Sequence, residues 1–516
     1  MRSALRIIRN TYRDSVSLMQ LSARIAALPG VRRASVVMAT GGNLALLREV
    51  GLLDAPLEAS PGDLLALVEG EADDAIEAAL AQAEQALTGP EHAHSADGAA
   101  REFAPRSIQM ALAANPEANL ALISTPGDYA AAEALKALRL GLHVMLFSDN
   151  VSLADEAMLK REARARGLLV MGPDCGTAIV AGIPLGFANA VRRGPVGVIG
   201  ASGTGMQQVT SLIDRAGIGV SHALGTGGRD LSAGIGGATM LAALDELAAD
   251  AGTRVILLVS KPPAPEVAER VLSRARALGK PLVVCFLGAA AREIESDGIA
   301  AAETLEDAAA MAVALARGER PAPAPVSLPR LERPAFRAGQ RYVRGLYSGG
   351  TFCYEAALIL SRSLDDVRTN TPVGKAVALE DVWRSRGHTL IDLGDDEFTR
   401  GRPHPMIDHR LRNERMLREA ADAEAAVILL DVVLGYGAHA DPAGEMVPAI
   451  RAARAVAERA GRPLAFVGFV CGTEGDPQGL ARQQAALREA GVILLDNNAQ
   501  AARAAAAIAS GHGQTA

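Results

Sequence analysis

The chain has 516 residues, a net charge of −7 and 49% apolar residues, of which few are aromatic. This length exceeds what one hydrophobic core organises and predicts three to four domains, while the Ala, Val, Leu and Ile content favours helices on buried parallel strands. The acidic balance and the lack of a Lys/Arg-rich cluster argue against nucleic-acid binding.

Four widely separated cysteines, Cys175, Cys285, Cys353 and Cys471, form neither a disulfide framework nor a zinc motif, so we expect no metal. The N-terminus lacks the apolar core of a signal peptide. Apolar runs such as 255–259 have the length of a strand and are too short to span a membrane. We therefore expect a cytoplasmic protein that does not associate with membranes.

The first predicted elements form a small α/β domain over residues 1–98. Its strands are expected at 4–8, 34–38 and 63–68, and its helices at 14–27, from Asn43, and at 72–87. The stretch 88–98 is rich in Gly and Pro and contains His92 and His94, so it predicts a flexible connection rather than a metal site.

From Ser107 onward, strands and helices alternate regularly, which indicates parallel sheets in a multi-domain α/β protein. We assign domains to residues 99–192, 193–318 and 337–516, with a Pro- and Arg-rich linker at 319–336. Their strands are expected at 120–123, 143–147, 168–171, 196–199, 220–223, 255–259, 282–285, 344–346, 389–393, 426–431, 464–470 and 492–494.

The most informative loop is Gly200-Ala201-Ser202-Gly203-Thr204-Gly205, which follows a predicted strand and opens a helix. Its glycines leave backbone N–H groups open at a helix N-terminus, where a phosphate or carboxylate binds, and two hydroxyl groups add donors. Thr204 and Gln207 have the spacing of a capping box. The glycine spacing matches neither the dinucleotide-binding nor the P-loop motif. A tight turn that binds nothing is the alternative.

Two further glycine loops follow predicted strands. The first contains Gly227, Gly228, Arg229 and Asp230, and the second is Ser348-Gly349-Gly350-Thr351. Arg229 could pair with an anion, and Asp230 could hold a loop N–H or a metal-bound water; a surface salt bridge is the alternative. Glycine loops at equivalent places in two domains predict duplicated phosphate-binding folds that face each other.

Candidate acid–base residues are His439 and Asp431, in the loop 431–442, and His404, in the polar segment 392–409. An imidazole near carboxylates is compatible with proton transfer or a divalent cation, although ordinary loop histidines are the alternative. Cys175 closes another strand end, where a buried inert thiol is the usual outcome.

Four runs resemble the α subunit of succinyl-CoA synthetase in order and spacing: 123–129, 171–176, 197–205 and 225–230. The part after the linker resembles the C-terminal domain of that enzyme's β subunit. The whole chain resembles the FdrA family, often labelled acyl-CoA synthetase. This resemblance implies a Rossmann-like CoA-binding-type domain at 99–192, followed by two flavodoxin-like synthetase domains.

The resemblance also implies roles for particular residues. The loop matching Gly200–Gly205 holds the phosphate of a phosphohistidine in the synthetase, and the loops matching Pro126 and Pro173, Asp174 and Cys175 line its CoA pocket. Three features of the synthetase have no counterpart here. Residues 287–293 contain no histidine where the phosphohistidine belongs, the nucleotide-binding loop that begins the CoA domain is missing, and no ATP-grasp domain is present.

The resemblance therefore implies a subunit of an oxamate carbamoyltransferase in allantoin (purine) breakdown, which makes carbamoyl phosphate from oxalurate and phosphate. We expect phosphate as a substrate or ligand, CoA as a second possible ligand, other subunits as partners, and an oligomer. One alternative is an acyl-CoA synthetase subunit that needs a separate ATP-grasp partner. The other is a non-catalytic scaffold or ligand-sensing subunit.

Overall fold

The computed structural model describes residues 2–49, 53, 57–88, 105–326, 328–331, 333–400 and 402–510. It divides into two compact units, which are described separately below. Unit 1 comprises Met1–Asp174 and Asp396–Ile407, and unit 2 comprises Cys175–Asp395 and Asp408–Ala516. The expected flexible connection with His92 and His94 lies, apart from Thr88, outside the described residues.

Unit 1 begins with an antiparallel sheet of order β1-β3-β2. The elements are β1 (Arg2–Ile8), α1 (Ser15–Ala26), β2 (Val31–Met38), α2 (Gly41–Glu49), β3 (Leu64–Gly70) and α3 (Asp73–Thr88). One buried cluster joins side chains of α1 and α3 to one face of the sheet, and a second joins Leu47 of α2 to the other face. Both faces are therefore covered, which explains why β3 is almost continuously apolar.

The rest of unit 1 contains a parallel sheet of order β4-β5-β6. Its elements are α4 (Ile108–Ala114), β4 (Leu120–Ile123), α5 (Gly127–Arg139), β5 (His143–Leu146), α6 (Leu153–Ala165) and β6 (Val170–Met171). Ser152 caps α6 by accepting a hydrogen bond from the Asp155 N–H, as an N-cap serine does. α13 (Asp396–Thr399) also groups with unit 1.

The first half of unit 2 is a seven-stranded sheet of order β13-β12-β11-β9-β10-β7-β8. Its strands are β7 (Thr177–Val180), β8 (Ile183–Gly186), β9 (Arg193–Gly200), β10 (Val220–Gly225), β11 (Val255–Ser260), β12 (Leu282–Phe286) and β13 (Ile299–Ala301). Its helices are α7 (Gly203–Arg215), α8 (Ala238–Ala249), α9 (Pro265–Arg276), α10 (Ala291–Ile294) and α11 (Leu305–Ala316). The hairpin β7–β8 pairs with β10 here, so we propose that this domain begins near Cys175 and not at residue 193.

The second half is a sheet of order β16-β15-β17-β14-β18-β19-β20. Its strands are β14 (Tyr342–Tyr347), β15 (Val367–Thr369), β16 (Val377–Ala378), β17 (His388–Asp392), β18 (Ala425–Val433), β19 (Ala465–Cys471) and β20 (Ile493–Leu495). Its helices are α12 (Gly350–Leu360), α14 (Arg410–Ala421), α15 (Pro442–Arg459), α16 (Leu480–Glu489) and α17 (Asn498–Ser510). The described residues between Ala316 and Tyr342 form no helix or strand.

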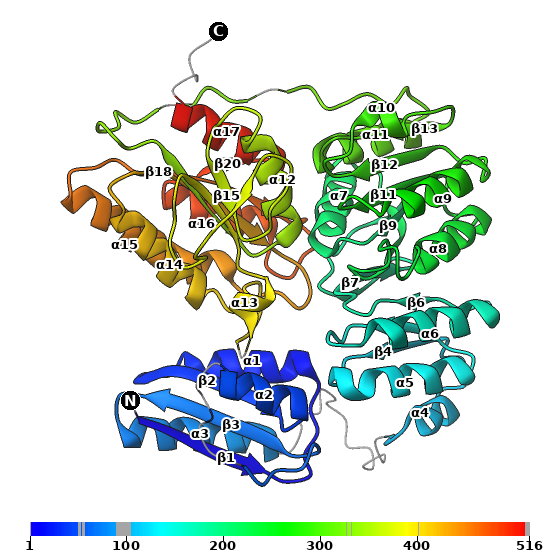
Figure 1. Ribbon diagram of the computed structural model, residues 1–516, viewed down its shortest axis with the longest axis horizontal. Coiled ribbons are helices and arrows are strands. Elements are labelled where there is room, and N and C mark those ends of the chain that lie inside the picture. Colours follow the sequence, from blue (N-terminus) through cyan, green and yellow to red (C-terminus); the bar gives the residue numbers. More distant parts are fainter. Residues whose placement is uncertain are drawn as a thin grey trace. The chain divides into compact units, whose positions relative to one another are not determined.

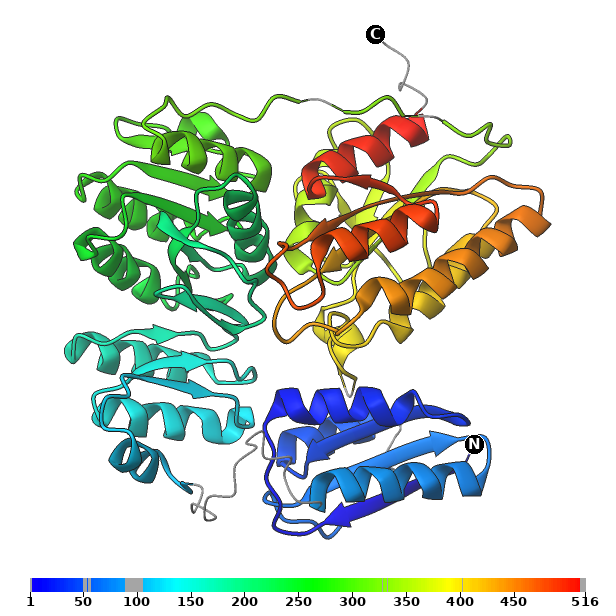
Figure 2. The ribbon, with the colours of Figure 1, turned by 180° about the vertical axis from the view of Figure 1, so that it is seen from behind.

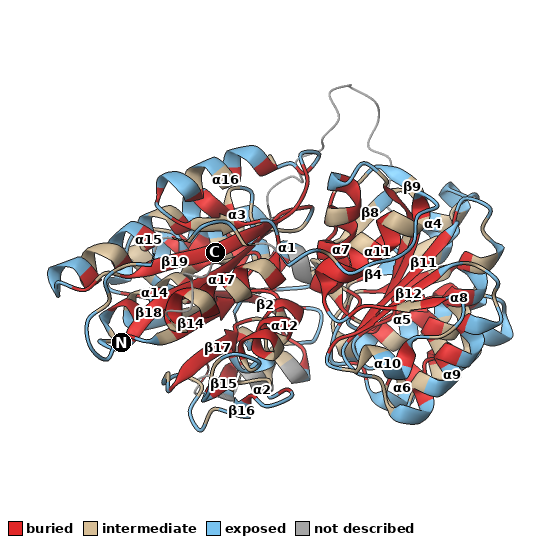
Figure 3. Cartoon of the chain, turned by 90° about the horizontal axis from the view of Figure 1, so that it is seen from above, coloured by how far each residue is buried: buried red, intermediate tan, exposed pale blue. Residues whose placement is uncertain are grey.

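The two halves of unit 2 repeat one topology. The order β13-β12-β11-β9-β10 in the first sheet corresponds to β20-β19-β18-β14-β17 in the second, with parallel pairing throughout. Helices lie on both faces of each sheet (Figure 1, and from behind in Figure 2). The strands are buried along most of their length (Figure 3), as parallel sheets require. The multi-domain α/β fold expected from the sequence is confirmed.

Polar side chains join these two halves. The Asn498 side-chain amide donates hydrogen bonds to the Phe352 carbonyl (2.9 Å) and to Glu355 Oε2 (2.8 Å), while Glu355 Oε1 accepts from the Leu305 N–H (2.7 Å). The Glu355–Leu305 bond crosses between the halves, and Asn498 holds the Glu355 carboxylate from within the second half.

Candidate functional site

The two glycine loops of unit 2 meet at their first helical turns. The hydroxyl groups of Ser202, before α7, and Thr351, in α12, lie 2.7 Å apart. The two helices pack against each other (Figure 1), and the Thr204 side chain lies against Gly349. Each loop follows the central strand of its sheet, and these contacts place the two helix N-termini side by side.

The first turn of α7 leaves donors open. Ser202 is the N-cap, and its hydroxyl accepts the Gly205 N–H at 3.2 Å. As the first two residues of the helix, Gly203 and Thr204 have no carbonyl inside it to which their N–H groups could donate. The capping box expected from Thr204 and Gln207 is wrong, because Gln207 donates to Asn189 Oδ1 instead.

The first turn of α12 is open in the same way. Gly349 precedes the helix and offers no side-chain cap, so the first N–H groups of α12, from Gly350 onward, are not capped. The space there requires glycine, since a Cβ on Gly350 would collide with the Asp392 carboxylate. Two helix N-termini that both keep open N–H groups lie in contact here, which forms an anion-binding geometry that one helix does not provide.

Asp431 holds the second loop in place. Its carboxylate accepts the N–H groups of Ser348 and Gly349 and the Ser348 hydroxyl, each at 2.8 Å. Arg412 Nη1 lies 2.8 Å from Asp431 Oδ1, and both side chains are fully buried. Both oxygens of this carboxylate therefore accept hydrogen bonds from protein groups, which position the loop. An acid–base role for Asp431 stays a prediction.

His439 lies beside this ion pair. Its ring centroid is 5.4 Å from that of His409, and the His409 Nδ1 contacts Arg412 Nη2 at 3.0 Å. The Nδ1 of His439 accepts the Asp441 N–H, which leaves Nε2 for other partners. The third candidate, His404, falls in unit 1, and its Nδ1 accepts the Met406 N–H.

The loop carrying His439 also contacts the first half of unit 2. A Cβ on Gly437 would lie 2.9 Å from the Phe187 ring, and the Phe187 carbonyl accepts the Thr177 hydroxyl at 2.8 Å. Thr177 Oγ1 in turn faces Gly203. Phe187 and Thr177 therefore connect the His439 loop to the loop that begins α7.

The Gly225–Asp230 loop has two different parts. Asp230 is fully buried, and its carboxylate accepts the N–H groups of Thr239 (3.0 Å) and Met240 (2.9 Å) at the start of α8. It thus holds backbone N–H groups, which was one of the two expected roles. Gly227 is buried, whereas Gly228 and Arg229 are exposed at the carboxyl edge of the sheet.

The loops expected to line a CoA pocket are divided between the units. In unit 1, Pro126 precedes α5, Pro173 is buried, and the Asp174 N–H donates to the Ser148 carbonyl at 3.0 Å. These loops gather at the carboxyl edge of β4, β5 and β6. Cys175 belongs to unit 2, where its buried Sγ lies 3.5 Å from the Gly225 carbonyl.

One candidate residue, Lys261, was not recognised from the sequence, and Asp392 was noted only as the start of the polar segment 392–409. Lys261 directly follows β11, and Asp392 ends β17, so both lie at the carboxyl edges that carry the glycine loops. Burial raises the pKa of Asp392 to about 7, and Lys261 opposes this rise. The position of a lysine immediately after a buried strand was the available signal for Lys261.

The loop after β12 lacks the phosphoryl-carrying histidine of the synthetase. It reads Leu287-Gly288-Ala289-Ala290, and a Cβ on Gly288 would lie 3.5 Å from the Leu358 side chain of α12. An apolar contact with α12 therefore occurs next to the place where the synthetase resemblance implies an imidazole.

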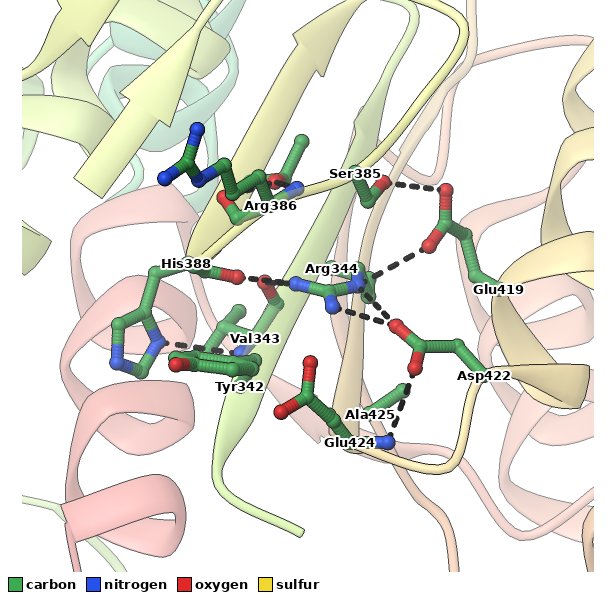
Figure 4. Close-up of polar contacts among 12 residues, drawn as sticks. Tyr342, Val343, Arg344, Ser385, Arg386, His388, Glu419, Asp422, Glu424 and Ala425 are labelled. Atoms are coloured by element: carbon green, nitrogen blue, oxygen red, sulfur yellow. Dashed lines mark hydrogen bonds and ion pairs between the residues drawn. The ribbon is translucent and has the colours of Figure 1, made fainter. Parts of the chain in front are cut away.

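The opposite, amino edge of the second sheet is held by a buried arginine (Figure 4). Arg344 is 3.0 Å from Glu419 and 2.5 Å from Asp422, and it donates to the Gly387 carbonyl. Beside it, burial and the Arg344 charge lower the pKa of His388 to about 4, so the neutral ring accepts the Val343 N–H. This network anchors the sheet at the end away from the glycine loops.

Three protein families match parts of the chain. Residues 1–105 match "AllF, heavy metal-associated domain", residues 191–288 match "CoA binding domain", and residues 346–508 match "CoA-ligase". The CoA-binding match thus falls on the first half of unit 2, whereas the resemblance to the synthetase implied such a domain at 99–192.

The N-terminal family name implies a metal, which the residues do not fit. No cysteine occurs before Cys175, so the thiolates that bind soft metals are missing. Within the part of the chain that the structure describes, no group of three His, Cys, Asp or Glu side chains could hold a metal ion. Among the same residues, no helix combines the length and apolar content needed to cross a bilayer.

Three known proteins illustrate the relationships. YahF of Escherichia coli (strain K12) is 44% identical over 497 residues, which is 95% of both chains. The succinate–CoA ligase subunit alpha 1 of Archaeoglobus fulgidus is 28% identical over 152 residues, 29% of this chain and 51% of its own. This chain therefore spans about half of that subunit.

Among solved structures, the dinucleotide-forming acetyl-coenzyme A synthetase 1 of Ca. Korarchaeum cryptofilum is 17% identical. The match covers 77% of this chain and 83% of that one. The TM-score of 0.32 is too low to indicate a shared overall arrangement. The identity and coverage of YahF show that this chain belongs to the YahF family, and its domains are of the succinyl-CoA synthetase and CoA-ligase type.

Proposed function

We propose that this chain is an enzyme subunit that binds phosphate between the first turns of α7 and α12 and transfers a carbamoyl group to it. The substrate would be oxalurate, and the products carbamoyl phosphate and oxamate. The observation that carries the proposal is the Ser202–Thr351 contact, which joins two helix N-termini whose first N–H groups are open. Their N–H groups and dipoles favour a phosphate at this place.

The missing phosphohistidine favours transfer to free phosphate. A relay through the protein needs a nucleophile in the loop after β12, and residues 287–290 supply no imidazole. A site that keeps the phosphate cradle without the carrier suits a reaction in which phosphate itself attacks a carbonyl carbon. Holding the two reactants together in this way lowers the entropic part of the barrier.

A CoA ligase subunit is the second candidate. It is favoured by the matches to the CoA-binding and CoA-ligase families over 191–288 and 346–508. This function would require a partner that contributes a nucleotide site. Binding of CoA to the full-length chain, and thioester formation with ATP in the presence of such a partner, would support it over carbamoyl transfer.

The test is phosphate-dependent turnover of oxalurate by the full-length chain together with the proteins encoded beside it. We expect carbamoyl phosphate and oxamate to form in equal amounts. Gly203→Val should abolish both turnover and calorimetric phosphate binding, because its branches would fill the space before the open N–H groups. Gly62→Val, at an exposed glycine with no atom within 4 Å of an added Cβ, is the control. Absence of turnover, or phosphate binding unaffected by Gly203→Val, would reject the proposal.

A further inference from the structure

A lysine and a carboxyl group flank the first turn of α12 from the two halves of unit 2. Lys261 follows β11 of the first sheet, and Asp392 ends β17 of the second. The ammonium of Lys261 lies 5.2 Å from the ring centroid of Tyr354, on α12, and its charge acts on both Asp392 and Cys353. The two side chains therefore approach the same helix end.

One oxygen of the Asp392 carboxyl group accepts a hydrogen bond from the protein. Its Oδ1 accepts the Gly394 N–H at 2.9 Å, and the Asn370 side chain bonds both the Asp392 N–H (2.9 Å) and its carbonyl (3.0 Å). Its Oδ2 lies against Gly350 at the start of α12. In the described part of the chain, no residue donates a hydrogen bond to Oδ2. One oxygen thus stays available where the helix N-terminus would hold an oxyanion.

The surroundings let this carboxyl group hold a proton near neutral pH. Burial is the main cause that raises its pKa to about 7, and Asp395 and Asp431 raise it further. The Gly394 hydrogen bond and the Lys261 charge act in the opposite direction. A group that titrates near the working pH can both donate and accept a proton during turnover.

We propose that Asp392 is the proton donor to the leaving nitrogen of the carbamoyl substrate and that Lys261 holds the phosphate dianion beside α12. This rests on the proposed carbamoyl transfer. The amide nitrogen of oxamate is a poor leaving group unless it is protonated, so the reaction needs an acid at this position. Neither residue is among the glycine loops that first indicated the site.

The proposed step balances in atoms and charge. A phosphate oxygen of HPO₄²⁻ attacks the carbamoyl carbon, and the bond between that carbon and the nitrogen of the oxamate part breaks. The leaving nitrogen takes the proton of Asp392, and the proton that phosphate loses returns to the Asp392 carboxylate. The products are carbamoyl phosphate and oxamate. In the reverse direction, Asp392 removes a proton from the oxamate amide.

The test compares Asp392→Asn and Lys261→Gln with wild type in the full complex. Asp392→Asn keeps the shape and can still accept the Gly394 N–H, but it cannot transfer a proton. We expect kcat to fall about 10²- to 10⁴-fold, with inorganic phosphate bound as in wild type. Lys261→Gln should weaken phosphate binding about tenfold or more, because a charge-assisted contact is lost. Asp365→Asn and Lys136→Gln, at exposed positions, are the matched controls.

The pH profile separates an acid from a merely structural residue. In wild type, oxalurate cleavage should decline as pH rises through about 7, whereas the reverse reaction should increase over the same range. Both pH dependences should disappear in Asp392→Asn. Near-normal turnover of this variant with both pH dependences unchanged would overturn the acid role alone. Phosphate affinity unaffected by Lys261→Gln would overturn the role of the lysine. Absence of wild-type turnover would reject the proposed function, and with it this inference.

Discussion

The hydroxyl groups of Ser202 and Thr351 lie 2.7 Å apart although the two residues are 149 positions apart in the sequence. This hydrogen bond connects the equivalent turns of two repeated sheets and places both helix N-termini at one site. Ser202 also caps α7 by accepting the Gly205 N–H, so one side chain serves the helix and the interface together.

Replacing these hydroxyl groups tests the contact directly. Ser202→Ala should lower the free energy of unfolding by about 1–2 kcal/mol, since it removes an N-cap and an interdomain hydrogen bond. Thr351→Val should cost about 1 kcal/mol, and Thr351→Ser should retain the bond. Urea denaturation of the single and double variants gives the coupling energy. A coupling energy of zero would show that the hydroxyl contact does not stabilise the interface.

Two glycines of the first loop should differ in their tolerance of a side chain. A Cβ on Gly205 would collide with Ser202 Oγ and lie 3.1 Å from Val259 and 3.2 Å from Thr351. Gly205→Ala should therefore destabilise the chain by about 1–3 kcal/mol, as overpacking does. A Cβ on Gly203 meets only Thr177 Oγ1, at 3.3 Å, so Gly203→Ala should cost less. Equal thermal midpoints for the two variants would contradict this packing.

His388 should make stability depend on pH. The pKa of His388 is about 4 in the folded state, below the ordinary value near 6.5. Burial and the charges of Arg344 and Arg341 lower this pKa, and they outweigh Asp366 and Asp365, which raise it. The folded state therefore binds fewer protons than the unfolded state between these values. The stabilisation is complete above pH 6.5 and is lost as the pH falls toward 4. Urea denaturation across this range should show a shallower pH dependence for His388→Asn than for wild type, and identical slopes would exclude this role.

The interface amide of Asn498 should be costly to remove. Asn498→Ala leaves the Phe352 carbonyl and Glu355 Oε2 without their donor in a buried place. We expect a loss of about 2–3 kcal/mol in the free energy of unfolding, since an unpaired buried acceptor costs more than the bond itself contributes. Asn413→Ala, which removes a hydrogen bond at an exposed site, should cost clearly less. A similar loss for both variants would contradict the importance of the buried contact.

The sequence by itself determined most of the fold. Buried parallel strands are almost continuously apolar, as in 255–260 and 425–433, because helices cover both faces. Glycine-rich turns after such strands mark the carboxyl edges, so the loops beginning at Gly200 and Ser348 were recognisable. Short strands at or next to a sheet edge, such as β13 and β15, were missed, because three residues give too weak a pattern.

The tertiary structure decided which of these residues act together. The residue that caps α7 is the one whose hydroxyl group reaches an N–H of the first turn, and in the structure this is Ser202. The spacing of Thr204 and Gln207 in the sequence could not identify it. The role of Asp431 became clear only when its carboxylate was seen holding the Ser348 loop across two strands. Lys261 and Asp392 come from different sheets, 131 positions apart in the numbering, and no local pattern links them. Sequence patterns report periodicity and local turns, whereas a site is defined by distances between segments that only the packed sheets bring together.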